Sequence, residues 1–177
     1  MTRRHELRCS DDIDRPYDQV RDALTADPRG ILARATRAAT DPRDAPAELR
    51  VRVGALELAA EVELEITGIT EAEAAPPVRP STRIDLTWRS RRTPGLFPAM
   101  TGAVQLAPAA PGHTALTFEG TYDPPLGIVG DAIDALGMHR LAETSVARLI
   151  HDLGAFLRSE LPMMPGPGDT FVLAGPE

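Results

Sequence analysis

Apolar and polar residues alternate along much of this chain, which is the period of a strand with one buried face. The first instance is short, with Leu7 and Cys9 between charged or polar neighbours. Cleaner runs follow residue 48, and their inward rows are Leu49, Val51 and Val53; Val62, Leu64 and Ile66; Ile84, Leu86 and Trp88; Met100, Gly102, Val104 and Leu106; and Leu116, Phe118, Gly120 and Tyr122. About six strands result. Because helices do not separate the later strands, we expect an antiparallel meander.

Helical spacing follows the first strand. Asp14-Arg15-Pro16 is a helix-start signature with Pro in the first turn, and the apolar residues after it are Tyr17, Val20, Ala23 and Leu24. This predicts a short helix that ends near Asp27-Pro28. A second short helix is expected over Gly30 to Ala39, where Ala and Arg favour a helix although the few larger apolar residues fix no period.

A long amphipathic helix is predicted near the C-terminus. At ~100° per residue one face collects Met138, Ala142, Ser145, Val146, Leu149, Ile150, Leu153, Phe156 and Leu157. Ile133 and Leu136 lie off this stripe, which predicts a break, a kink or a change of contacts near Gly137. The helix is expected to stop by Leu161-Pro162. We therefore expect one domain over residues 1–161 and a Pro/Gly-rich tail over residues 162–177.

Composition narrows the classes of function. The chain has 177 residues, 42% of them hydrophobic, a net charge of -7 and a pI near 5.1. That acidity opposes binding to nucleic acid and to anionic membranes, since both require a basic surface. A single cysteine, Cys9, cannot form an internal disulfide, and no segment approaches the ~20 apolar residues of a membrane span. We expect a cytoplasmic protein without stable membrane insertion, and a homodimer stays open.

Several catalytic motifs are missing from the sequence. There is no Gly-x-Ser-x-Gly elbow, no His-Glu-x-x-His, no phosphate loop ending in Lys and no dinucleotide-binding glycine pattern after a strand. Serine hydrolase, metalloprotease, nucleotide kinase and dehydrogenase functions therefore lose their main supports. No cofactor is expected.

The order of elements resembles that of the START-like, or SRPBCC, helix-grip superfamily over roughly residues 4–161. More specific are Leu96-Phe97-Pro98 before the strand Met100 to Leu106, the stretch from Gly120 to Asp134, and His139-Arg140-Leu141-Ala142-Glu143. These look like a bacterial subgroup of that superfamily. The resemblance implies an α+β helix-grip fold, with a curved antiparallel sheet of about six strands around the C-terminal helix and two short helices after the first strand.

The resemblance also implies a cavity between sheet and helix that holds lipids, polyketides or other apolar molecules. Some members of the superfamily are polyketide aromatases or cyclases and others only carry or sense a ligand, so fold does not decide function. We expect a non-catalytic binder or carrier of a small hydrophobic ligand. Two alternatives stay open: an aromatase/cyclase-like enzyme in the same pocket, and a protein-interaction module with a closed core.

Candidate ligand-binding residues follow from the inward rows and the apolar face of the helix: Trp88, Met100, Phe118, Tyr122, His139, Ser145 and Leu149. Trp88 and Tyr122 carry polar tips, but plain core packing explains them equally well. Ser145 offers a hydroxyl to a ligand or, more commonly, to a carbonyl one turn earlier in the helix. The segment before Gly137 is a candidate gate over the pocket.

Two charged groups have alternative explanations. His139 with Glu143 one turn on suits a tuned acid/base or half a metal site, but with no third ligand a structural pair is favoured and no metal is expected. Asp11, Asp12 and Asp14 resemble paired carboxylates. Their position between a strand and a helix start predicts capping and turns instead.

Overall fold

The structure, a computed structural model, describes residues 5–38, 48–53, 56–75, 77–90, 99–123 and 135–163. Its strands are β1 (His5–Ile13), β2 (Glu48–Val53), β3 (Leu56–Ala72), β4 (Ser81–Ser90), β5 (Ala99–Ala110) and β6 (His113–Asp123). Its helices are α1 (Tyr17–Ala26), α2 (Pro28–Ala38) and α3 (Ala135–Glu160). The two short helices after the first strand and the long C-terminal helix are confirmed.

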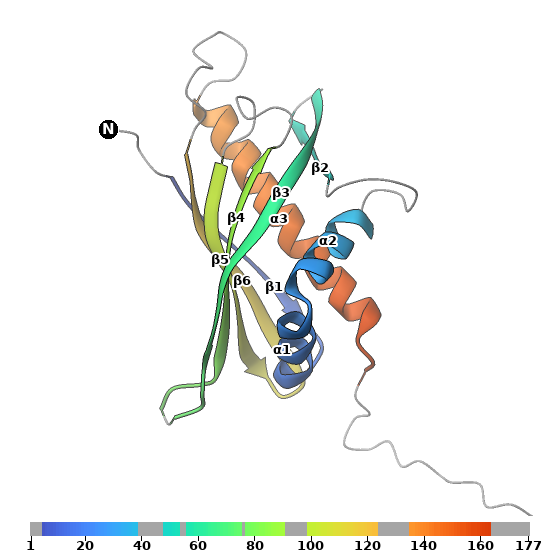
Figure 1. The fold of residues 1–177 in the computed structure, drawn as a ribbon, viewed down its shortest axis with the longest axis vertical. Helices are drawn as coiled ribbons and strands as arrows, with labels where there is room; N and C mark the ends of the chain where they lie inside the picture. The colour runs from blue at the N-terminus through green and yellow to red at the C-terminus, as the bar shows by residue number, and fades with distance from the viewer. Residues whose placement is uncertain are drawn as a thin grey trace, which may run out of the picture.

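The six strands form one antiparallel sheet in the order β1-β6-β5-β4-β3-β2. From β2 to β6 each strand pairs with the next along the chain, while β1 joins beside β6, so the predicted meander and strand number are confirmed. The β5 and β6 strands meet through a tight turn in which Gly112 has φ 76°, a left-handed conformation that favours glycine. The sheet curls, and the helices lie on one side of it (Figure 1).

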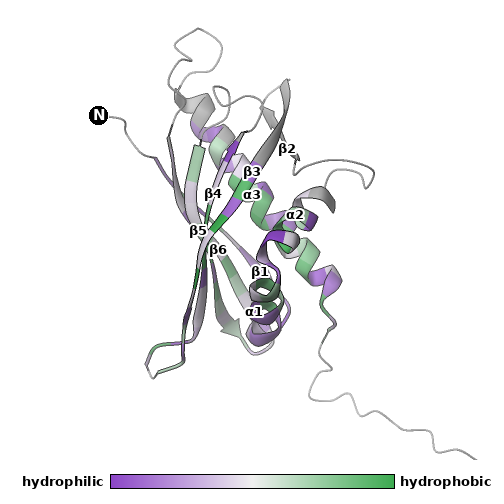
Figure 2. Cartoon of the chain, in the orientation of Figure 1, coloured by the Kyte–Doolittle hydropathy of each residue, from purple (hydrophilic) through white to green (hydrophobic). Residues whose placement is uncertain are grey.

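Helix α3 crosses the inner face of the sheet and packs against β1, β2, β6 and α2. Its inward stripe is buried as predicted, at Ala142, Ser145, Val146, Leu149, Ile150, Leu153 and Leu157, with Phe156 half-buried. Figure 2 shows hydrophobic and hydrophilic residues interspersed along this helix, as one buried and one wet face require. None of the described helices is long and apolar enough to cross a bilayer.

The first turn of α3 contains Gly137, near which a break was predicted. The helix runs without interruption from Ala135, so Gly137 lies within its first turn and does not separate two helical pieces. Residues 124–134, which include most of the candidate gate, and the side chain of Met138 lie outside the described part of the chain.

The carboxylates predicted to cap α1 pair with other side chains instead. Asp11 and Asp12 lie within β1, where Asp11 binds Arg158 of α3 at 2.9 Å and Asp12 lies 3.0 Å from His113. Helix α1 has Pro16 at its N-cap with no side-chain cap, and Asp14 pairs with Arg15 at 3.0 Å. Asp14 lies in the bend between β1 and α1, as expected. The capping prediction was wrong, because β1 extends to Ile13 and Asp11 pairs with Arg158 of α3 instead.

The interior is closed at the end where α1 lies. The Tyr17 hydroxyl of α1 shares a 2.8 Å hydrogen bond with Thr82 of β4, and both residues are buried. Ile13, Val20 and Leu24 are fully buried around them. Polar groups paired inside a dense apolar cluster make this end a packed core.

Candidate functional site

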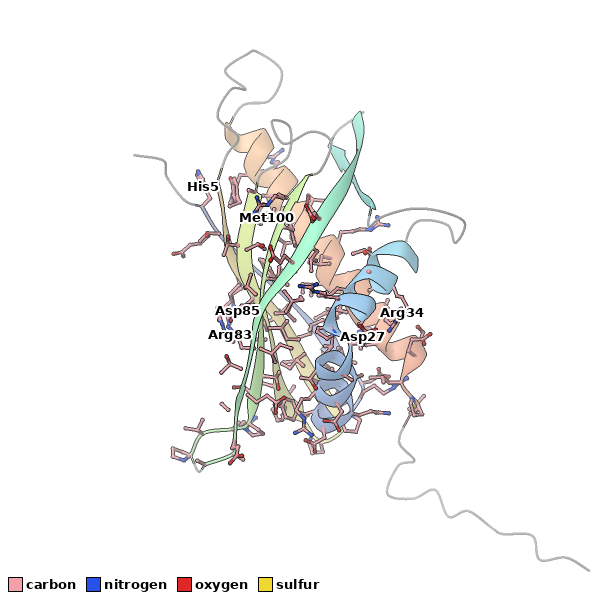
Figure 3. The ribbon with its side chains drawn as sticks, viewed as in Figure 1. His5, Asp27, Arg34, Arg83, Asp85 and Met100 are labelled. Carbon is pink, nitrogen blue, oxygen red and sulfur yellow. The ribbon has the colours of Figure 1, made fainter. Side chains whose placement is uncertain are left out.

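One row of side chains crosses five strands at the end of the sheet where β1 begins. The antiparallel register places His5 of β1, Tyr122 of β6, Met100 of β5, Trp88 of β4 and Leu64 of β3 opposite one another in that order. Directly opposed residues share a face, and in this row it is the inner one. Figure 3 shows His5 and Met100 at the end of the sheet opposite α1. We call these five residues the aromatic row.

Three predicted site residues lie in the aromatic row, and a fourth, Phe118, stacks against one of them. Tyr122, Met100 and Trp88 are 1%, 2% and 5% exposed. Phe118, which is fully buried, stacks against Trp88 with ring centroids 5.8 Å apart and an angle of 24° between the rings. The four side chains therefore form one buried cluster on the inner face of the sheet.

Two glycines create the space that the Phe118 ring occupies. Gly102 and Gly120 are opposed in the next row of the sheet, and a Cβ on either would lie within 2.8 Å of Phe118 ring atoms or of neighbouring backbone. The absence of both side chains lets the ring lie over the strands beside the aromatic row. The two glycines therefore shape the floor of the site.

His139 brings polar chemistry to this apolar surface from α3. Its Nδ1 forms a 3.2 Å hydrogen bond with the Tyr122 hydroxyl, and its Nε2 lies 3.2 Å from Oε1 of Glu143. The two contacts join α3 to β6 through a chain of three side chains. The His139–Glu143 contact that the sequence predicted is present, and the structure adds Tyr122 to it.

His5 completes the cluster and is not among the residues predicted from the sequence. Its ring stacks on Tyr122 at 5.0 Å with an angle of 19°, and its centroid is 5.8 Å from that of His139. The signal was available, because His5 continues the alternation of Leu7 and Cys9 by one step.

Burial raises the pKa of the Tyr122 hydroxyl, and the negative charge of Glu143 raises that pKa further. Both causes disfavour the phenolate. Tyr122 therefore stays protonated through the neutral range. The hydroxyl has a proton to give to His139 or to a bound molecule.

Cys9 lies on the inner face two rows from His5, opposite Phe118. Burial is the main cause that raises the pKa of its thiol. A raised pKa lowers the fraction of reactive thiolate at neutral pH. We therefore assign no chemistry to Cys9.

Ser145 and Leu149 lie one and two turns further along α3 from the polar chain. Both are 2% exposed and belong to the face of α3 that meets the sheet. Within the described residues no group of three or more His, Cys, Asp or Glu side chains is arranged to hold a metal ion.

A separate hollow of about 510 Å³ lies on the outer face of the sheet, between β1, β6 and β4. Its charged lining residues are Glu6, Arg8, Arg83 and Glu119. Arg8 pairs with Glu119 at 3.3 Å, and Arg83 pairs with Asp85 at 2.9 Å. Figure 3 shows Arg83 and Asp85 on the side of the sheet away from α2. This hollow is distinct from the interior between sheet and helix.

The strand order, the curl of the sheet and the position of α3 agree in one architecture. The chain has the helix-grip fold. No protein-family model matches its sequence. No curated protein sequence matches it either.

Solved structures similar to this helix-grip chain include a conserved protein from Geobacillus kaustophilus, with 13% identity, a TM-score of 0.48 and coverage of 88% of this chain and 96% of that one. Norcoclaurine synthase from Thalictrum flavum has 12% identity, a TM-score of 0.46 and coverage of 88% and 87%. The di-domain ARO/CYC BexL from the BE-7585A biosynthetic pathway has 14% identity, a TM-score of 0.48 and coverage of 92% and 51%.

Proposed function

We propose that this protein binds a small, largely apolar molecule between the aromatic row and the first turns of α3. The observation that carries the proposal is the Tyr122–His139 hydrogen bond, which lies beside Trp88 and Met100. Ligand sites are typically apolar surfaces with a few polar groups that fix orientation. In this proposal the rings contact the ligand skeleton, and Tyr122 contacts its polar group.

The two ends of the interior support this location. At the α1 end the polar atoms of Tyr17 and Thr82 pair with each other inside the core. At the opposite end His139 is half-buried and Glu143 is exposed, so a polar chain runs from solvent to the buried Tyr122 hydroxyl. In the proposal Phe118, Ser145 and Leu149 line the deeper side of the ligand.

Ligand retention tests the proposal directly. The purified protein is incubated with a bacterial lipid extract, purified again, extracted with organic solvent and analysed by mass spectrometry. We expect a retained apolar compound. Met100→Trp fills the centre of the aromatic row and should abolish retention of the compound. Thr101→Trp, on the exposed outer face of the same strand, should leave its retention unchanged. Equal retention by the two variants would place the ligand elsewhere.

Trp88 provides a second measurement, because it is the single tryptophan of the chain. Addition of the retained compound should shift or quench Trp88 emission in the wild type. An unchanged emission spectrum, together with no retained compound, would favour the alternative of a protein-interaction module with a closed core.

A second candidate is acid–base catalysis on the bound molecule. The observation that favours it is the Tyr122–His139–Glu143 chain, since a base oriented by a third group is a recurring catalytic arrangement. The test is exchange of the hydrogens next to the carbonyl of 1-tetralone in D2O, followed by NMR. Catalysed exchange that Tyr122→Phe abolishes would support an enzyme. Equal exchange rates with and without protein would favour a binder that does not catalyse this reaction.

A further inference from the structure

The contact between His139 and Glu143 fixes which imidazole nitrogen carries the proton. Nε2 lies 3.2 Å from Oε1 of Glu143, which is more than half exposed. An ionised carboxylate has lone pairs and no proton to donate. A lone pair on Nε2 would lie beside this negative charge, so the neutral imidazole carries its hydrogen on Nε2 and leaves Nδ1 with a lone pair.

That tautomer sets the direction of the bond to Tyr122. Nδ1 without a hydrogen accepts, so the Tyr122 hydroxyl is the donor across the 3.2 Å distance. A tyrosine hydroxyl has one proton, and here the proton is given to His139. The lone pairs of the same oxygen still accept hydrogen bonds.

We infer that the polar group recognised at Tyr122 is a hydrogen-bond donor, such as a hydroxyl, phenol or amine, and that a molecule offering only a carbonyl is disfavoured at neutral pH. The inference rests on the proposed function and specifies its ligand class. The physical reason is that a carbonyl beside Tyr122 would meet an oxygen with no proton to share and would lose its hydrogen bond with water.

A protonated His139 would reverse the preference. The titratable groups near His139 in the described part of the chain are Tyr122 on β6, His5 on β1 and Glu143 on α3. When His139 is protonated, both ring nitrogens donate, and Nδ1–H then points at the Tyr122 oxygen. The Tyr122 hydroxyl then no longer donates its hydrogen to His139 and donates it to the ligand instead. A carbonyl becomes an acceptable partner.

The tautomer is measured without any ligand. Two-bond ¹H–¹⁵N spectra of the full chain labelled at histidine distinguish the two neutral forms, and His139→Gln assigns the signal. We expect hydrogen on Nε2 and a bare Nδ1 at pH 8. Hydrogen on Nδ1 would overturn the inference. In Glu143→Gln the preference for Nε2–H should weaken, because a carboxamide both donates and accepts.

Ligand preference is measured with a matched pair of probes, 1-tetralol and 1-tetralone, which share a ring system and differ in hydrogen-bonding group. By calorimetry at pH 8 we expect 1-tetralol to bind about fivefold more tightly, the effect of one net hydrogen bond. The ratio should fall to about one in Tyr122→Phe and decrease in Glu143→Gln. Asp152→Asn is the matched control, because Asp152 forms an i,i+4 pair with Arg148 on the same helix, and it should leave the ratio unchanged.

The outcomes separate the inference from the proposed function. If 1-tetralone binds more tightly than 1-tetralol at pH 8, the inference is overturned while ligand binding stands. The same holds if Tyr122→Phe leaves the ratio of the two affinities unchanged. Failure of both probes to bind, with no compound retained from lipid extract, counts against the proposed function, and the NMR result still decides the tautomer.

Discussion

The guanidinium of Arg15 donates a 2.8 Å hydrogen bond from Nε to the backbone carbonyl of Leu161, although 146 positions separate the two residues. Its Nη2 donates a second bond, of 2.6 Å, to the carbonyl of Arg158. The last carbonyls of a helix lack partners within the helix. Arg15, only 6% exposed, therefore caps α3 and joins its end to the start of α1.

Replacing this buried cap should be costly. Arg15→Gln is expected to lower the free energy of unfolding by about 2–4 kcal/mol, because two bonds from a charged donor are lost and carbonyls are left buried. Chemical denaturation followed by circular dichroism measures it. Arg8→Gln, which removes an exposed ion pair with Glu119, should cost less than about 1 kcal/mol. Similar losses in the two variants would contradict the capping role.

Gly154 permits the close approach of α3 to β1. A Cβ at this position would collide with the carboxylate of Asp11, which binds Arg158. Gly154→Ala alone should therefore destabilise by about 1 kcal/mol, although alanine normally stabilises a helix interior relative to glycine. In an Asp11→Ser background the same change should become stabilising. A double-mutant cycle of unfolding free energies measures the reversal, and additive effects would show that Asp11 is not the obstacle.

The floor of the aromatic row should tolerate no side chain at Gly102. The added Cβ of Gly102→Ala would meet the Phe118 ring at 2.5 Å and the Glu119 carbonyl oxygen at 2.7 Å. We expect a loss of about 1–3 kcal/mol in unfolding free energy from overpacking. Gly68→Ala is the matched control, since its Cβ would make ordinary contact with Asp85 at 3.5 Å, and it should change stability by less than about 0.5 kcal/mol. Equal effects would argue against a tight floor.

Ionisation of Tyr122 should lower the free energy of unfolding at alkaline pH. Burial first, and the charge of Glu143 second, raise the pKa of its hydroxyl above the value of ~10 that the unfolded chain has. The folded state then holds the proton after the unfolded state has lost it. The resulting stabilisation is fully present below about pH 10 and disappears as the pH rises through the folded pKa.

Urea unfolding of the wild type and Tyr122→Phe between about pH 9 and 12 measures this loss, and the chain has no lysine to titrate in that window. The wild type should lose stability more steeply than the variant. Glu143→Gln should lower the pKa of Tyr122, which a titration of tyrosinate absorbance detects. Parallel stability curves for wild type and Tyr122→Phe would contradict the shift.

Periodicity was sufficient for most strands and for the long helix of the fold, whereas the second short helix was predicted from its composition. The inward rows of β4, β5 and β6 and the buried stripe from Ala142 to Leu157 were predicted because each element buries one face, and burial imposes a period of two on strands and about 3.6 on helices. The same periods placed Trp88, Met100, Phe118 and Tyr122 on the inner face. They also contained His5, which is in phase with Leu7.

Register and long-range pairing came only from the tertiary structure. Alternation shows which face a residue occupies, but it does not show that His5, Tyr122, Met100 and Trp88 stand in one row, because that depends on where each strand slides against the next. The Tyr122–His139 bond and the Arg15 cap join segments distant in sequence. Asp11 was misassigned for the same reason, since its partner Arg158 comes from a helix that folding brings alongside β1. Local patterns determined the elements, and the chemistry of the site arose from contacts that exist only once those elements pack.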